Sequence, residues 1–168
     1  IFYIPLLGLF FLGIADTLFA AGLDKKVEHA LQFSQEQLKK TVSQIKDPSL
    51  LVRTTNPDGS WGTIKAGDWT SGFFPGLLWM ASEYTKEPEF RKWAEGWTAL
   101  LEDQKNNTRD HDVGFRIFCS YGNGYRLHGS KEYRQVILTT AKSLATRFNP
   151  KVGCTRSWSW SNGKWTFP

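Results

Sequence analysis

The sequence predicts an all-α protein built from repeated helical hairpins. Apolar residues recur at helical spacing in several segments that are separated by turn residues. Two hexads, residues 68–73 and 110–115, share Asp, Gly and Phe at the same positions. A Glu-aromatic-Arg triplet follows each hexad in register, at residues 89–91 and 132–134. A period of about 20 to 50 residues made of helix pairs is typical of a solenoid or a closed helical ring.

The first twenty residues differ from the rest of the chain. Residues 1–20 are almost wholly apolar, carry Asp16 as their only charge and lead into small residues. This pattern is typical of a secretory signal peptide, which we expect to be truncated because it has neither an initiating Met nor a basic start. A membrane anchor is the alternative, since the length suffices. We predict a secreted or periplasmic protein that keeps residues 21–168 and has no stable membrane insertion after cleavage.

The expected elements follow from apolar periodicity and from the residues that begin and end helices. Asp47-Pro48 ends the first helix, and residues 53–67 are expected to form a loop with a strong turn signal at residues 56–60. Ser130 is expected to cap the last helix. The expected helices are residues 24–45, 69 or 70 to 84, 89–103, 113–121 with a continuation to 127, and 131–148.

Composition excludes several classes of function. The 168 residues carry a net charge of +5, with acidic residues interspersed and no Lys/Arg run longer than two. A nucleic-acid partner is therefore not indicated, and no nucleotide-loop or zinc motif is present. Cys119 and Cys154 either pair, as a secreted protein allows, or remain thiols, which the apolar surroundings of Cys119 favour.

The second hexad replaces Trp69-Thr70 of the first with His111-Asp112, which suggests a scaffold unit adapted to carry chemistry. Asp112 is either a helix N-cap or a site carboxylate with His111 beside it. Trp69 is either a core residue or a platform for a sugar ring. In a repeat array, Trp69 and Asp112 should lie close together. Three tryptophans in residues 158–165 suggest pocket lining, and Arg156 is a cation that could face a carboxylate.

Several motifs in order resemble the unsaturated glucuronyl hydrolases, family 88 of the glycoside hydrolases. The motifs that carry the resemblance are residues 68–79, 111–115, 124–127, 145–150 and 156–158.

The resemblance implies an (α/α)6 barrel, six helical hairpins in a ring, and hydration of the double bond of a Δ4,5-unsaturated uronic acid at the non-reducing end of glycosaminoglycan- or pectin-derived oligosaccharides. It implies no metal and no organic cofactor. By position, Asp112 matches one of two essential family carboxylates, and Trp69 and His111 match residues that contact the unsaturated sugar.

The same resemblance places the second aspartate, the proposed general acid/base, just beyond Phe167-Pro168. Six hairpins of this period need about 260 residues, so residues 21–168 are expected to form only the first half of the barrel and to be inactive alone. Two other functions stay open: an unsaturated rhamnogalacturonyl hydrolase, and a non-catalytic helical-repeat module that binds glycans.

Overall fold

The computed structural model describes residues 7–157, with side chains from residue 23 onward. The chain divides into two compact units, residues 1–44 and residues 45–168. The first unit holds α1 (Leu7–Gln44), which ends within one residue of the predicted end but begins at Leu7 instead of residue 24. Cleavage of residues 1–20 remains a prediction. Among the described residues, no helix combines the length and apolar character needed to cross a membrane.

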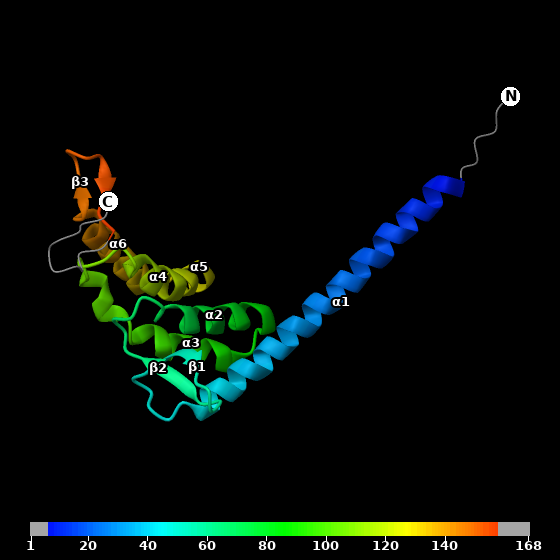
Figure 1. Cartoon of the computed structure of the whole chain (residues 1–168), viewed down its shortest axis with the longest axis horizontal. Coiled ribbons are helices and arrows are strands. Elements are labelled where there is room, and N and C mark those ends of the chain that lie inside the picture. Colours follow the sequence, from blue (N-terminus) through cyan, green and yellow to red (C-terminus); the bar gives the residue numbers. More distant parts are fainter. Residues whose placement is uncertain (1–6, 158–168) are drawn as a thin grey trace. The chain divides into compact units, whose positions relative to one another are not determined.

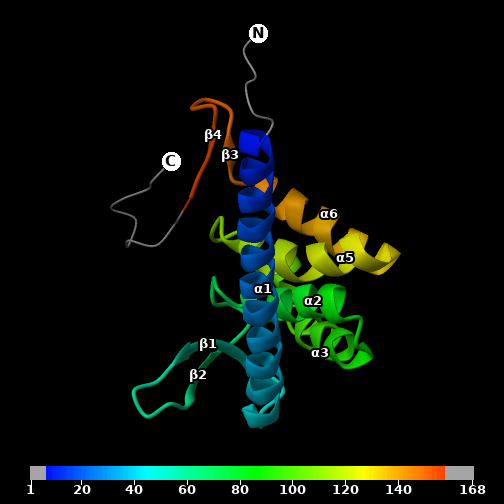
Figure 2. The same cartoon turned by 90° about the vertical axis from the view of Figure 1, so that its right-hand side faces the viewer.

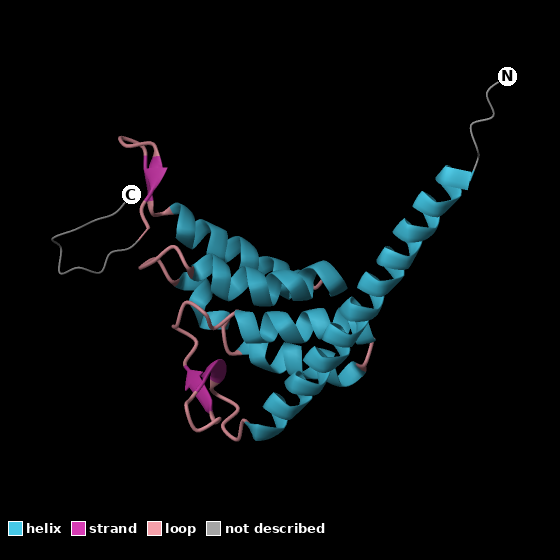
Figure 3. Cartoon of the chain, turned by 45° about the vertical axis from the view of Figure 1, so that its right-hand side comes forward, coloured by secondary structure: helices cyan, strands magenta, loops and turns pink. Residues whose placement is uncertain are grey.

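The second unit is mostly helical and consists of two consecutive hairpins (Figure 1; Figure 3). The first hairpin pairs α2 with α3, and the second pairs the run α4-η2-α5 with α6. The helical elements are α2 (Phe73–Thr85), α3 (Pro88–Ala99), the 3-10 helix η1 (Glu102–Asn106), α4 (Val113–Ile117), the π-helix η2 (Phe118–Gly122), α5 (Asn123–His128) and α6 (Lys131–Ala145).

Helix ends follow the local chemistry of the sequence. Pro75 lies in the first turn of α2, where its missing N–H costs no hydrogen bond, and Pro88 begins α3 for the same reason. Ser130 caps α6 as predicted, because its hydroxyl accepts the N–H of Tyr133 at 3.2 Å. Gly129 ends α5 with φ +65°, a left-handed conformation that suits glycine.

The expected continuation of the helix beyond residue 121 is present as α5. Asn123 begins α5, and its side-chain amide donates to the Cys119 carbonyl at 2.8 Å. The irregularity lies just before it, in the single π-helical turn η2, and such turns occur often at functional sites.

The all-α prediction is wrong in part, because two short antiparallel ribbons interrupt the helices. Strands β1 (Leu51–Thr55) and β2 (Trp61–Ile64) occupy about half of the predicted loop, and the turn signal at residues 56–60 joins them. Figure 2 shows this ribbon extending to one side of α2 and α3. Strands β3 (Phe148–Asn149) and β4 (Cys154–Thr155) form the second ribbon. Phe148 therefore lies outside α6 and is half exposed.

Helices α2 and α4-η2 pack closely through two glycines. A Cβ atom on Gly72 would lie 2.2 Å from the Phe115 carbonyl oxygen, and one on Gly76 would lie 2.9 Å from that of Cys119. Larger residues would therefore force the backbones apart. This close approach brings the N-terminal ends of two successive repeats to the same edge of the unit.

The core lies between these helices and β1. Its apolar residues include Leu51 from the ribbon, Leu101 after α3, and Val113, Ile117, Tyr121 and Val136 from the second hairpin. A polar pair is also enclosed, since the Trp79 indole N–H donates to the Thr98 hydroxyl at 2.9 Å and both residues are fully buried. This core fixes the two hairpins relative to each other, and with them the loops that precede α2 and α4.

Candidate functional site

The loops that precede α2 and α4 have the same local structure. The Asp68 carboxylate accepts the backbone N–H of Thr70 at 2.9 Å, and the Asp110 carboxylate accepts that of Asp112 at 3.0 Å. Both are Asx turns, in which an aspartate side chain binds the backbone two residues later. The repeated Asp of the two hexads is thus a frame residue that shapes each loop.

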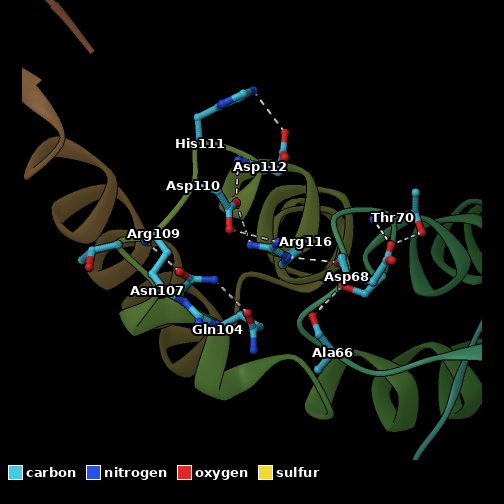
Figure 4. Close-up of polar contacts among 12 residues, drawn as sticks. Ala66, Asp68, Thr70, Gln104, Asn107, Arg109, Asp110, His111, Asp112 and Arg116 are labelled. Carbon is cyan, nitrogen blue, oxygen red and sulfur yellow. Dashed lines mark hydrogen bonds and ion pairs between the residues drawn. The ribbon is translucent and has the colours of Figure 1, made fainter. Parts of the chain in front are cut away.

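A buried arginine connects the two loops. Arg116 is 3% exposed and binds Asp110 through both terminal nitrogens, at 3.0 and 3.3 Å. Its Nε donates to the backbone carbonyl of Asp68 at 3.1 Å. Figure 4 shows this guanidinium between the two loops. The loop of one repeat is therefore tied directly to the loop of the next.

Asp112 occupies the N-cap position of α4, but its side chain makes no capping hydrogen bond. Its carboxylate instead lies 3.1 Å from Nε2 of His111, and its side chain is 14% exposed. The pair sits at the free edge of the loop, away from the Asp110–Arg116 pair (Figure 4). The simple capping interpretation of Asp112 is therefore wrong, and its carboxylate remains available for chemistry beside an imidazole.

Three aromatic rings pack together near the starts of α2 and α4. Trp69, Phe73 and Phe115 contact one another edge to face, with ring centroids 5.9 to 6.2 Å apart. Between about a third and a half of each residue is exposed. The repeated Phe of the hexads thus packs against its own counterpart. Rings that stay exposed while packing edge to face offer apolar surface to a ligand.

Trp69 and Phe115, together with Asp112, line an open depression of about 630 Å³. Trp69 and Asp112 share it, as the repeat predicted, and His111 lies on its wall. The lining residues are Gly67, Asp68, Trp69, Asp110, His111, Asp112, Phe115 and Arg116.

The three carboxylates of the depression differ in their partners. Burial raises the pKa of Asp68, but the hydrogen bonds from Thr70 and the positive charges of Arg53 and Arg116 outweigh it, so the net pKa lies below the ordinary value. Asp68 pairs with Arg53 at 2.9 Å, and Asp110 pairs with Arg116. Asp112 faces His111 instead of an arginine. Of these three, Asp112 has the carboxylate best suited to a reacting ligand.

Other predicted site residues have different outcomes. Arg156 is exposed and does not line the depression within the described part of the chain, although its carbonyl accepts a hydrogen bond from Arg147. The tryptophans at positions 158, 160 and 165 lie outside the described residues. Cys119 and Cys154 are both free thiols, and burial raises the pKa of Cys119.

Arg116 and Asp110 were not singled out from the sequence. A signal was present, because Arg116 interrupts an apolar run and aligns with the buried Phe74 of the preceding repeat. A charged side chain at a core position needs a partner. Asp110, the Asp that the two hexads share, is the nearby aspartate.

Comparison with curated proteins identifies relatives in one group of hydrolases. The chain is 44% identical over 106 residues to an unsaturated glucuronyl hydrolase of Formosa agariphila, covering 62% of this chain and 26% of that protein. It is 32% identical over 94 residues to an unsaturated chondroitin disaccharide hydrolase of Streptococcus pneumoniae, covering 54% and 24%. The chain thus spans about a quarter of the length of these relatives. No family model matches it.

Solved structures agree with the sequence relatives. An unsaturated glucuronyl hydrolase specific for heparin matches with a TM-score of 0.77 and 34% identity, over 83% of this chain and 37% of that one. A mutant unsaturated glucuronyl hydrolase from Streptococcus agalactiae, complexed with dGlcA-GalNAc6S, matches with a TM-score of 0.65 and 23% identity, over 73% of this chain and 33% of that one. The second match shows the fold alone. The helical hairpins described here correspond to part of these proteins.

Proposed function

We propose that the protein containing this chain removes a Δ4,5-unsaturated uronic acid from the non-reducing end of an oligosaccharide. The chain is a homologue of the unsaturated glucuronyl hydrolases of glycoside hydrolase family 88. One observation carries this proposal. The Asp112 carboxylate does not cap its helix, lies beside His111, and lines a depression together with aromatic rings. The same depression is lined by Trp69 and His111, the two residues that we propose contact the unsaturated sugar.

The proposed reaction adds water across the C4=C5 double bond of the uronic acid. An acid gives a proton to C4, the water oxygen bonds to C5, and one proton of that water passes to a base, which leaves a hydroxyl on C5. The resulting hemiketal opens to a ketone, which leaves C1 as a hemiacetal that expels the remaining sugar as an alcohol. Protonation of C4 gives C5 cationic character, so a carboxylate nearby lowers the barrier.

Asp112 is the carboxylate that we place against this reacting carbon. Asp68 and Asp110 are each bound to an arginine, and the lowered pKa of Asp68 makes it a poor proton donor. We assign the proton transfer itself to a second aspartate, expected just after Phe167-Pro168. On this proposal, residues 21–168 alone do not turn over substrate.

The aromatic wall supports a sugar ligand. The C–H faces of a pyranose ring pack on exposed aromatic surface, and Trp69 presents such surface beside Asp112. The relatives are described as acting on heparin-derived and chondroitin-derived saccharides. We therefore propose a glycosaminoglycan-derived substrate, with a pectin-derived one as the competing class. We also propose export to the periplasm or outside the cell, which fractionation of the producing cells would test.

The test uses the full-length protein that contains this chain and an unsaturated glycosaminoglycan disaccharide. Hydration removes the ultraviolet absorbance of the conjugated double bond, so the loss of absorbance reports turnover. We expect Asp112→Asn to lower kcat by at least about a hundredfold, the usual contribution of a positioned acid or base. Asp103→Asn, at an exposed position on η1, is the matched control and should retain activity. Full activity in the Asp112 variant would refute the assignment.

The same assay separates the two alternatives. A rhamnogalacturonyl hydrolase would turn over pectin-derived disaccharides and leave the glycosaminoglycan ones intact. A non-catalytic glycan-binding module would bind saturated and unsaturated disaccharides equally well without any loss of absorbance.

A further inference from the structure

Arg116 is a charged side chain in a buried position. It is 3% exposed on α4, and the chain provides it with three acceptors from two different loops. A buried guanidinium must be paired and hydrogen-bonded to be tolerated. The Asp110 carboxylate supplies the counter-charge with two-point geometry, which fixes the direction as well as the distance of the contact.

The hydrogen bonds of Arg116 complete a chain that runs through the site. The Thr70 N–H donates to Asp68, the Asp68 carbonyl accepts from Arg116, and Arg116 donates to Asp110. The Asp110 oxygen that binds Arg116 at 3.0 Å also accepts the Asp112 N–H at 3.0 Å. Figure 4 shows this series of contacts between the labelled residues. Trp69 lies inside one Asx turn and His111 inside the other.

The charge of Arg116 is not available to a ligand. Its side chain is 4% exposed, and Asp110 neutralises it. A substrate carboxylate would have to displace Asp110 and break its Asx turn. Arg116 therefore acts on the site through the loops that it holds, without touching the substrate.

The fold itself does not require an arginine at this position. In the preceding repeat the equivalent place on α2 is occupied by Phe74, which is 5% exposed and packs edge to face on Trp97. An apolar residue thus satisfies the same packing position. Of the two repeats that the structure describes, the one with His111 and Asp112 carries the arginine, which indicates a role in the site.

We propose that Arg116 is a positioning residue for the reaction: with Asp110 it sets the distance between the sugar platform at Trp69 and the carboxylate of Asp112. This rests on the proposed function for its kinetic part. The expected signature is a lower kcat with a nearly unchanged KM, because the loops remain present but no longer hold the reacting groups in register. A misplacement of about 1 Å is enough to cost up to about a hundredfold in rate.

The experiment compares Arg116→Lys and Asp110→Asn in the full-length protein. Lysine keeps the charge but loses the fork that reaches Asp110 and the Asp68 carbonyl together. Asparagine keeps an acceptor for the Asp112 N–H but offers Arg116 a single oxygen. We expect each variant to lower kcat about tenfold to a hundredfold and to change KM less than about threefold. The double variant should lose no more than the worse single one, since both act on one contact.

The matched control is Arg126→Lys. Arg126 also binds a carboxylate through both terminal nitrogens, with Glu83 at 2.6 and 2.7 Å, and also links two repeats, but both side chains are 42% or more exposed. It should retain wild-type kcat, since an exposed pair contributes little. Wild-type kcat in folded Arg116→Lys and Asp110→Asn, or an equal loss in Arg126→Lys, would overturn the proposal.

A second readout does not depend on turnover. Hydrogen exchange of residues 66–72 and 109–115 should accelerate in both loops when Arg116 becomes lysine, although only one loop lies on the same repeat. Acceleration confined to residues 109–115 would refute the link between loops. If the wild type turns over no unsaturated disaccharide, the proposed function fails, while the exchange measurement still decides whether Arg116 holds the loops together.

Discussion

Asp68 and Asp110, one repeat apart, bind the backbone in the same way: each accepts the N–H two residues later, at 2.9 and 3.0 Å. What differs is the pair of residues that each turn presents. The first turn presents Trp69-Thr70, and the second presents His111-Asp112. A duplicated frame can thus be kept for structure while its inserts diverge, one toward a sugar platform and the other toward a carboxylate.

Asp68 should make the protein sensitive to acid. Its folded pKa lies below the ordinary value, so its stabilising effect is present above the unfolded pKa of about 3.9 and is lost as pH falls through the folded pKa. Asp68→Asn keeps an acceptor for Thr70 but loses the charge opposite Arg53, and should cost about 1 kcal/mol at neutral pH. Denaturant unfolding from pH 7 to 3 should show a steeper loss in the wild type. Parallel curves for the two proteins would count against this account.

Gly72 should tolerate no side chain, because of the close approach of α2 and α4. The Cβ of Gly72→Ala would meet backbone oxygens of Phe115 and Arg116 at 2.2 and 2.4 Å, and neither can rotate away. Overpacking of this kind costs about 1 to 3 kcal/mol.

Gly96→Ala is the matched control for that change. Gly96 lies on α3 with nothing within 4 Å of an added Cβ, so alanine should stabilise by up to about 1 kcal/mol. Urea unfolding of both variants gives the comparison. Equal effects at the two positions would mean that the helices separate without cost.

The sequence predicted most of the helices because their signals are local. Ser130 marks a helix start that the structure confirms, and the apolar spacing of residues 131–144 follows the buried face of α6. The repeat also placed Trp69 and Asp112 together, because equivalent positions in successive hairpins lie on one side.

The remaining features depend on contacts that a local pattern does not contain. Residues 51–55 form a strand because Leu51 is buried in the core and because residues 61–64 pair with this segment. The turn signal between the two strands indicated only a loop. The partners of Arg116 are its neighbour Asp110 and a carbonyl 48 residues away. Apolar periodicity shows that a charged residue occupies a core position, but it does not show which groups that residue binds.

Arg147 should hold the His111 loop from its other side. Its guanidinium donates to the carbonyls of Thr108, Arg156 and Ser157 at 2.6 to 2.8 Å, and the Ser157 carbonyl also accepts the N–H of His111 at 3.1 Å. Arg147→Gln cannot reach all three carbonyls, and the loss of partly buried hydrogen bonds from a charged group should cost about 1.5 to 3 kcal/mol.

Arg147→Gln should also alter hydrogen exchange, and only in the loop that contains His111. We expect faster hydrogen exchange at residues 108–112 in Arg147→Gln, while α2 and α3 keep their protection, because the three carbonyls that the Arg147 guanidinium binds lie outside that hairpin. Arg91→Gln is the control, since its pair with Glu95 is exposed and should contribute less than about 0.5 kcal/mol. Unchanged exchange at residues 108–112 would show that the loop keeps its conformation without Arg147.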